Sequence, residues 1–270
     1  MSSPLLRVER DGDVALVTFQ DPDRLNAMTE AMGLALRDAA LALRDDGSLR
    51  AAVLTGAGRA FSAGGDLDMI EAKARRAAES PGGAVREENR AFMERFYRLY
   101  LSVLDLPFPT VAAIGGAAIG AGLCVALGCD VRVAARDAKL GLNFVRLGIH
   151  PGMGATFALP RLVGPARAAE LLFTGRSVDG AEAERIGLVN RAVERAEVLP
   201  TALELAREMA ASAPLAVRGA KQALARSLAS SLDEQLRFEA EQQSRNYESA
   251  DLREGIAAVR EKRAPRFEGR

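Results

Sequence analysis

Backbone amides in two glycine-rich stretches, Phe61–Asp66 and Pro109–Asp130, are the groups best suited to chemistry in this chain. The second stretch has no charged residue between Thr110 and Cys129 and carries glycines at positions 115, 116, 120, 122 and 128. A β-branched start, then glycines, then an apolar run predicts a buried strand, a tight turn and the start of a helix. Because glycine lets the backbone approach a ligand closely, this turn is a candidate binding site.

This apolar stretch is open to three interpretations. It could span a membrane, although its five glycines weaken a helix and the sequence has no second span. Its spacing Gly116-x3-Gly120-x-Gly122 is also similar to a dinucleotide-binding turn, in which helix amides hold a pyrophosphate. Short-chain dehydrogenases that use this spacing also carry a Tyr-x3-Lys pair, which none of the three tyrosines of this chain forms. The third interpretation is a backbone-amide site for an oxyanion.

Few side chains can carry a proton near neutral pH. His150 is the only histidine, and it is the better proton carrier because an imidazole titrates near neutrality. Cys124 and Cys129 are the only cysteines, and a thiol in apolar surroundings is more often a packing group. Asp68 and Glu71 open the helix expected after Asp66, where carboxylates favour the helix start. So few cysteines and histidines argue against a zinc site, and we expect no metal.

The composition is that of an ordinary globular protein. Of 270 residues, 49% are hydrophobic and 27% are charged, and 36 basic residues balance 36 acidic ones. This balance leaves no global field to attract nucleic acid or a membrane surface, so we expect neither partner. Two cysteines exclude a disulfide framework and favour a reducing compartment, and the first ten residues lack the apolar core of a secretory signal. We therefore expect a cytoplasmic protein.

Strands and helices alternate along the first part of the chain. The β-branched runs predict strands at 14–19, 51–55, 110–114 and 131–135. Helical spacing predicts a helix capped by Thr29, a charged helical segment from 67 to 88 that is broken at 80–83, and an amphipathic helix at 91–104. Beyond Val193 we expect only helices, at 199–211, 214–227, 232–247 and 252–262. The layout is an α/β core, 1–193, followed by a helical region, 194–270.

Phe61–Asp66 and Ala113–Gly122 together resemble the two oxyanion-hole segments of the crotonase (enoyl-CoA hydratase/isomerase) superfamily. Four further segments are similar to motifs of that family, and they are Arg24–Ala27, Leu147–Gly154, Leu172–Asn190 and Asp251–Phe267. The resemblance implies an α/β fold, a spiral of β-β-α turns with an all-helical C-terminal trimerisation region. It also implies an acyl-CoA thioester as ligand, a homotrimer or dimer of trimers, and no cofactor, since coenzyme A is part of the substrate.

The resemblance also assigns roles to individual residues. The N–H groups of Ala63 and Ala121 would hold the thioester oxygen, on which negative charge develops when an enolate forms. Ala121 replaces a glycine that is usual in the family, but its N–H can still donate. Lys262 would reach a CoA phosphate of a neighbouring subunit. The resemblance places the following residues along the CoA path: Arg24, Ala27, Ala60, Ala63, Gly64, Gly65, Asp66, Leu67 and Ala121.

The chain departs from the family at its acid–base positions. The two glutamates that hydratases use for general acid–base catalysis are replaced by Cys124 and Phe144, and a third carboxylate position, used by dienoyl isomerases and aryl-CoA dehalogenases, falls on Gly152. We therefore expect poor hydration or none, with His150 as the candidate substitute. The alternatives are an isomerase, a decarboxylase, a thioester hydrolase or an acyl-CoA-binding protein without catalysis. A nicotinamide dehydrogenase is a more distant alternative, and the acyl group is not predicted.

Overall fold

The computed structural model describes residues 3–80 and 82–270, and in them two β-sheets form the framework. The six-stranded sheet has the order β1-β2-β3-β5-β7-β10, with β1 (Leu6–Asp11), β2 (Val14–Phe19), β3 (Ala51–Gly56), β5 (Thr110–Ile114), β7 (Val131–Ala135) and β10 (Arg191–Val193). The four-stranded sheet has the order β4-β6-β8-β9, with β4 (Ala60–Ser62), β6 (Ala117–Ile119), β8 (Leu140–Gly141) and β9 (Ser177–Val178). Only the pairs β1–β2 and β8–β9 are antiparallel within these sheets.

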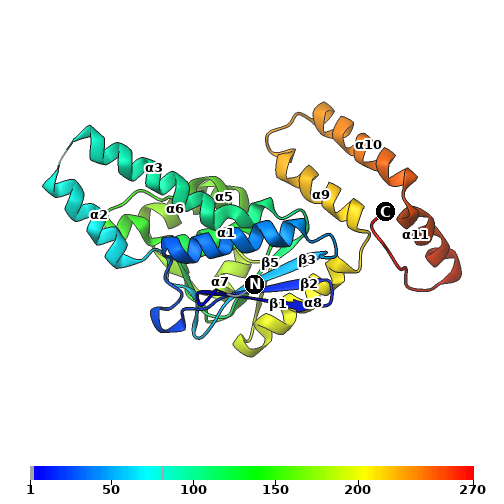
Figure 1. Cartoon of the computed structure of the whole chain (residues 1–270), viewed down its shortest axis with the longest axis horizontal. Helices are drawn as coiled ribbons and strands as arrows, with labels where there is room; N and C mark the ends of the chain where they lie inside the picture. The colour runs from blue at the N-terminus through cyan, green and yellow to red at the C-terminus, as the bar shows by residue number, and fades with distance from the viewer. Residues whose placement is uncertain (1–2, 81) are drawn as a thin grey trace.

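The chain moves between the two sheets in a regular order. The strands β3, β5 and β7 of the larger sheet are followed at once by β4, β6 and β8 of the smaller one. Helices follow each strand of the smaller sheet before the next strand begins. They are α2 (Leu67–Glu79) and α3 (Gly83–Tyr100) after β4, α4 (Ala121–Gly128) after β6, and α5 (Ala155–Val163) and α6 (Pro165–Thr174) after β8. This repeat is the predicted spiral of β-β-α turns. Figure 1 shows α1 (Glu30–Asp45) and α3 side by side over the sheet.

Short helices complete the connections. They are α7 (Gly180–Arg185) and the 3-10 turns η1 (Pro22–Arg24), η2 (Leu101–Asp105), η3 (Asn143–Leu147) and η4 (Arg195–Glu197). Two boundaries differ from the sequence-based expectation: α3 begins at Gly83 rather than near 91, and the chain from Leu101 tightens into η2. Thr29 caps α1 as predicted, because its side chain accepts a hydrogen bond from the N–H of Met32 at 3.2 Å.

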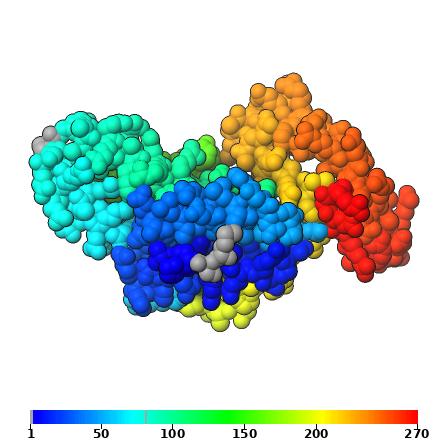
Figure 2. Space-filling view, in the orientation of Figure 1, coloured from blue at the N-terminus to red at the C-terminus, as the bar shows by residue number. Residues whose placement is uncertain are grey.

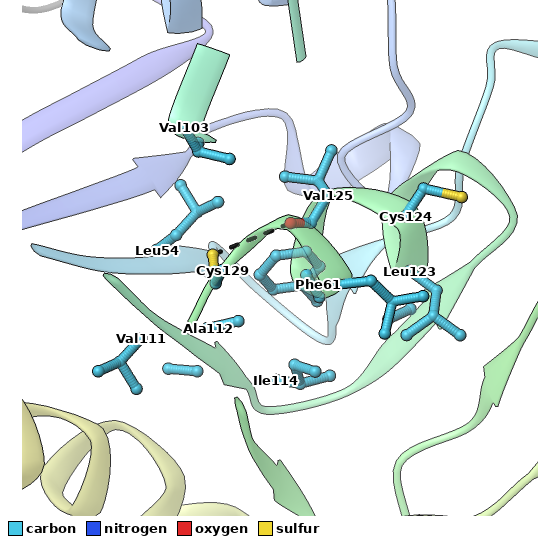
Figure 3. Close-up of a cluster of buried hydrophobic side chains, with 14 of the residues drawn as sticks. Leu54, Phe61, Val103, Val111, Ala112, Ile114, Leu123, Cys124, Val125 and Cys129 are labelled. Carbon is cyan, nitrogen blue, oxygen red and sulfur yellow. Dashed lines mark hydrogen bonds between the residues drawn. The ribbon is translucent and has the colours of Figure 1, made fainter. Parts of the chain in front are cut away.

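The uncharged stretch around Pro109–Asp130 is the centre of the hydrophobic core. All five residues of β5 are buried, and so is every residue of α4 from Ala121 to Leu127. Figure 3 shows side chains of this stretch packed around Phe61, which also makes an edge-to-face contact with Phe19 at 5.8 Å between ring centroids. The stretch is therefore divided between strands and one short helix. Within residues 3–80 and 82–270, no helix has both the length and the apolar character that a membrane span needs.

The C-terminal region is helical, as predicted, but its first helix belongs to the core. The helix α8 (Val198–Ala210) packs on β3, β5 and β7 and buries Val198, Ala202, Leu205, Ala206 and Ala210. The helices α9 (Pro214–Ser227), α10 (Leu232–Glu248) and α11 (Ala250–Glu261) form a separate lobe, which projects beyond the body (Figures 1 and 2). The boundary at 193 stays a prediction, with α8 packed on the core strands and α9 to α11 in the lobe.

Candidate active site

A cavity of about 710 Å³ lies between the loop after β4, the start of α4, and the helices α2 and α3. Most of the residues predicted for the site line it: Arg24, Ala27, Ala63, Gly64, Gly65, Asp66, Leu67, Ala121, Phe144 and His150. Three predicted residues, Ala60, Cys124 and Lys262, are not among its lining residues. Ala60 is buried inside β4, and Lys262 follows the end of α11 in the C-terminal lobe. The cavity therefore joins segments that are far apart in the sequence.

Close backbone packing brings the two glycine-rich stretches together at this cavity. A side chain on Gly64 would place its Cβ 2.5 Å from the carbonyl oxygen of Ile119 and 3.4 Å from the nitrogen of Ala121. A side chain on Gly122 would likewise place its Cβ 2.6 Å from the carbonyl oxygen of Ser62. Gly64 also has a φ of +92°, which other residues rarely adopt. Glycine is required here because the two backbones touch.

Two backbone N–H groups at this junction have no hydrogen-bond partner among the described residues. Ala121 is the first residue of α4, where N–H groups lack intrahelical acceptors, and no hydrogen bond from its N–H is formed within that part of the chain. On the other stretch, the N–H of Met28 donates to the carbonyl oxygen of Gly64, and the carbonyl oxygen of Met28 accepts from the N–H of Asp66. The N–H of Gly65, between these two, is without an acceptor in residues 3–80 and 82–270. Both residues line the cavity.

The prediction that Ala63 supplies a free donor is wrong in this structure. The N–H of Ala63 donates to the carbonyl oxygen of Leu25 at 2.9 Å, so it is already satisfied. The sequence motif identifies the segment but does not say which of its amides faces the ligand. Gly64 has a positive φ of +92°, and the amide without a partner in residues 3–80 and 82–270 is that of Gly65, two residues after Ala63.

The buried side chain of Asn26 fixes the segment that contains Leu25, whose carbonyl oxygen accepts the hydrogen bond from Ala63. Leu25 and Asn26 both have a φ of 54°, an unfavourable conformation for residues other than glycine. The Asn26 side chain is fully buried and donates to the carbonyl oxygens of Ala57 and Ala60 at 3.0 and 2.9 Å. It also accepts from the N–H of Asp21 at 2.9 Å. These bonds offset the strain of the two left-handed residues and fix the Leu25 carbonyl.

Asp66 has a structural role in this arrangement. Its carboxylate pairs with Arg24 and accepts a hydrogen bond from the N–H of Met69 at 2.9 Å, which caps the start of α2. The carboxylate is almost buried, while the guanidinium of Arg24 is half exposed at the cavity. Arg24 therefore remains available to an anionic ligand on its solvent side, whereas both oxygens of Asp66 are already used.

The two thiols are buried and unreactive groups. Cys124 Sγ lies 3.6 Å from the carbonyl oxygen of Gly152, to which it can donate, and Cys129 Sγ lies 3.9 Å from that of Val125. Figure 3 shows Cys129 within the packed side chains and Cys124 at the other end of the cluster. Burial raises the pKa of each thiol to about 12. Cys124 therefore stays protonated near neutral pH and cannot act as a base.

We expect these thiols to make stability depend on alkaline pH. Each holds its proton more tightly in the folded protein than in the unfolded chain, where a thiol has a pKa of about 8.5. Stability should therefore be intact below about pH 8.5 and should fall as the pH rises toward the folded pKa. Urea unfolding at pH 7.5 and pH 10 measures this loss. In the double variant Cys124→Ala/Cys129→Ala the loss should be smaller, and an identical pH dependence in both proteins would contradict the assignment.

The remaining candidates for proton transfer lie at the outer part of the cavity. His150 is exposed, and its Nδ1 lies 2.7 Å from the carbonyl oxygen of Pro151. Asp68 also lines the cavity and is exposed, whereas Glu71 is not a lining residue. Phe144 is half buried and contributes an apolar ring at the position where hydratases would carry a glutamate. The interior of the cavity is thus poor in groups that titrate near neutral pH.

Sequence reasoning missed several polar residues of the cavity wall, and they are Lys73, Asn89, Tyr97 and Asn143. Tyr97 on α3 lines the cavity, with its hydroxyl next to Gly152. Its only signal in the sequence was membership of an amphipathic helix, which does not separate a cavity residue from a core residue. Among residues 3–80 and 82–270 no group of three or more histidine, cysteine or acidic side chains could hold a metal ion.

A spiral of β-β-α turns that brings two glycine-rich stretches to one cavity defines the crotonase class of proteins. The model of the enoyl-CoA hydratase/isomerase family matches residues 9–270, so the chain belongs to this family. It is 37% identical over 258 residues to the short-chain-enoyl-CoA hydratase of Clostridium acetobutylicum, covering 95% of this chain and 94% of that protein. It is 36% identical over 258 residues to the 1,2-epoxyphenylacetyl-CoA isomerase of Escherichia coli, covering 95% of each.

The fold agrees with these relatives. The crystal structure of an enoyl-CoA hydratase from Bacillus anthracis superimposes with a TM-score of 0.89 at 33% identity, covering 98% of this chain and 100% of that one. The relatives include both hydratases and an isomerase, so membership of the family identifies an enzyme of this class but does not select the reaction.

Proposed function

We propose that this enzyme binds an acyl-CoA thioester and stabilises its enolate with the backbone N–H groups of Gly65 and Ala121. The observation that carries the proposal is the contact between the two glycine-rich stretches, which brings to one cavity two amides that have no partner within residues 3–80 and 82–270. When an enolate forms, negative charge moves onto the thioester oxygen, and each preorganised donor contributes about 2.7–4 kcal/mol to the stability of that state. The half-exposed guanidinium of Arg24 is available to the anionic CoA part.

We propose further that the reaction is not hydration. Hydration needs a base for the attacking water and an acid for the α-carbon, and the family's carboxylate positions hold Cys124, Phe144 and Gly152. Cys124 is buried and protonated, and Phe144 has no ionisable group. The candidate reactions are isomerisation, decarboxylation or thioester hydrolysis, with His150 or Asp68 as the proton carrier. The same apolar interior also favours a second candidate, an acyl-CoA-binding protein without turnover.

Acyl-CoA should protect the folded protein against heat. A ligand that binds only the folded state at 100 times its Kd adds about 2.7 kcal/mol to the free energy of unfolding. We expect butyryl-CoA to raise the Tm by several degrees, and CoA to raise it less because it cannot use the two amides. Thermal unfolding monitored during titration tests this, with adenosine as a control that lacks the pantetheine and thioester parts. A Tm that does not change with acyl-CoA would contradict the proposed function.

We propose that the C-terminal lobe assembles the protein as a homotrimer or dimer of trimers, which would place Lys262 near the CoA phosphate of a neighbouring subunit. Large apolar side chains lie exposed where α9 passes into α10, and they are Leu224, Leu228, Leu232 and Leu236. An exposed cluster of this kind is typical of a protein contact. Light scattering should find an oligomer that the variant Leu228→Asp/Leu232→Asp weakens. The control Leu41→Asp changes an exposed leucine on α1 and should leave the assembly unchanged. A monomeric wild-type protein would refute this proposal.

A further inference from the structure

The hydroxyl of Tyr97 occupies the space in which a side chain at position 152 would begin. A Cβ built on Gly152 would lie 2.2 Å from Tyr97 Oη and 2.8 Å from Tyr97 Cζ, so the two cannot coexist without movement. Tyr97 is half buried on α3 and lines the same cavity as Gly65 and Ala121. The third family position for a carboxylate is thus filled by a phenol that comes from a different element.

The surroundings make this phenol an isolated hydrogen-bond donor. The apolar residues Met93, Phe96 and Met153 line the same cavity. The neighbouring Cys124 uses its thiol toward the carbonyl of Gly152. Tyr97 Oη forms no hydrogen bond with the residues that the structure describes, and it is not among their buried unpartnered polar atoms, so the hydroxyl is accessible from the cavity. Burial, and then the nearby Cys124, raise the pKa of Tyr97, so the phenol keeps its proton across the physiological range.

We infer that the acyl group of the substrate carries an oxygen atom, as a hydroxyl or oxo group beyond the thioester, which accepts a hydrogen bond from Tyr97 Oη. This inference rests on the proposed acyl-CoA function. An unsubstituted acyl chain would cover the phenol and leave a buried donor unsatisfied, at a cost of about 1–3 kcal/mol. A site built around such a donor rejects ligands that lack the acceptor, which gives it selectivity among acyl-CoA thioesters.

The test compares the binding of 3-hydroxybutyryl-CoA and butyryl-CoA by isothermal titration calorimetry, with chromatography to check that the thioesters are unchanged. Wild type should bind the hydroxylated thioester about tenfold more tightly, as expected for one buried hydrogen bond. Tyr97→Phe should remove most of this preference while binding butyryl-CoA no less tightly. Gly152→Ala should also reduce the preference, because its Cβ displaces the hydroxyl.

Tyr100→Phe is the matched control, since it removes a hydroxyl from the same helix outside the cavity. Tyr100 Oη donates to the carbonyl oxygen of Thr29 at 2.7 Å, so this variant should be less stable but keep the preference. Equal binding of the two thioesters by wild type, or a preference that Tyr97→Phe retains, would overturn the inference and leave the proposed function intact. If neither thioester binds and CoA does not bind either, the inference about Tyr97 and the proposed acyl-CoA function would both be overturned.

Discussion

Crotonyl-CoA should be hydrated by this protein at least about 10⁴-fold more slowly than by a hydratase of the same family, because two acid–base groups that each contribute typically 10²–10⁴-fold are replaced. The expectation follows because Cys124 stays protonated near neutral pH and Phe144 has no ionisable group, so neither can act as a general base. Absorbance of the enoyl thioester measures the rate. The short-chain-enoyl-CoA hydratase of Clostridium acetobutylicum is a suitable comparison, as a relative of 37% identity.

Introducing glutamate at position 144 and at position 124 should affect the stability of the fold differently. Phe144→Glu introduces its carboxylate into the cavity and should be tolerated, because Phe144 is half buried and lines that space. Cys124→Glu introduces a carboxylate at a buried position and should destabilise the fold, since an unpaired buried charge is costly. Ordinary hydration rates in the wild-type protein would contradict the expectation. In that case, a large loss of the hydration rate in His150→Ala would identify His150 as the group that replaces the missing glutamates. An unchanged rate would make Asp68 the next candidate.

Replacing Ala121 by proline should lower turnover of the best acyl-CoA substrate about 10²–10³-fold, the typical cost of losing one oxyanion donor. The substitution should remove the N–H donor with little other change to the structure. Ala121 is the first residue of α4, a position that favours proline, and its N–H makes no hydrogen bond within the described part of the chain. Gly120 before it has φ 54° and ψ −121°, close to the mirror image of the conformation that usually precedes proline, and glycine adopts mirror-image conformations readily. We therefore expect little change in Tm.

Ala121→Gly is the matched control for the proline variant. It keeps the N–H and restores the residue that is usual in the family, so turnover should stay within a few-fold of wild type. Steady-state kinetics and thermal unfolding of the three proteins distinguish a lost donor from a damaged fold. If the proline variant keeps its activity and folds normally, Ala121 does not contribute to an oxyanion hole, and the proposed function loses one of its two donors.

Long and strongly patterned elements were predictable from the sequence. The strands β2, β3, β5 and β7 have β-branched runs, and the helices of the C-terminal region have clear apolar periodicity. The strands of the smaller sheet, two to three residues long, were not predicted. Such strands are too short to show a period, and the parallel pairing of β4 with β6 depends on contacts between distant segments.

The site was predictable as a set of segments, but the direction of individual groups was not. Motif matching placed Ala63 and Ala121 together, yet the choice of Gly65 over Ala63 depends on the left-handed turn at Gly64. Cys124 was predicted near the chemistry, but a sequence does not show the depth at which a helical residue is buried. Tyr97 was missed because it meets Gly152 only through the packing of α3 against a distant loop.

The two sides of the cavity differ in how freely they can change during evolution. The side formed by α4 is built into the core, where Gly122 leaves no room for a larger residue. The side formed by α2 has no buried residue, although Leu67, Met69 and Ile70 line the cavity from it. Substitutions at exposed positions usually change stability by no more than about 0.5 kcal/mol. Mutation can therefore reshape the cavity wall on α2 while the backbone of α4 stays in place, so descendants of one such chain can acquire new ligands without first acquiring a more stable fold.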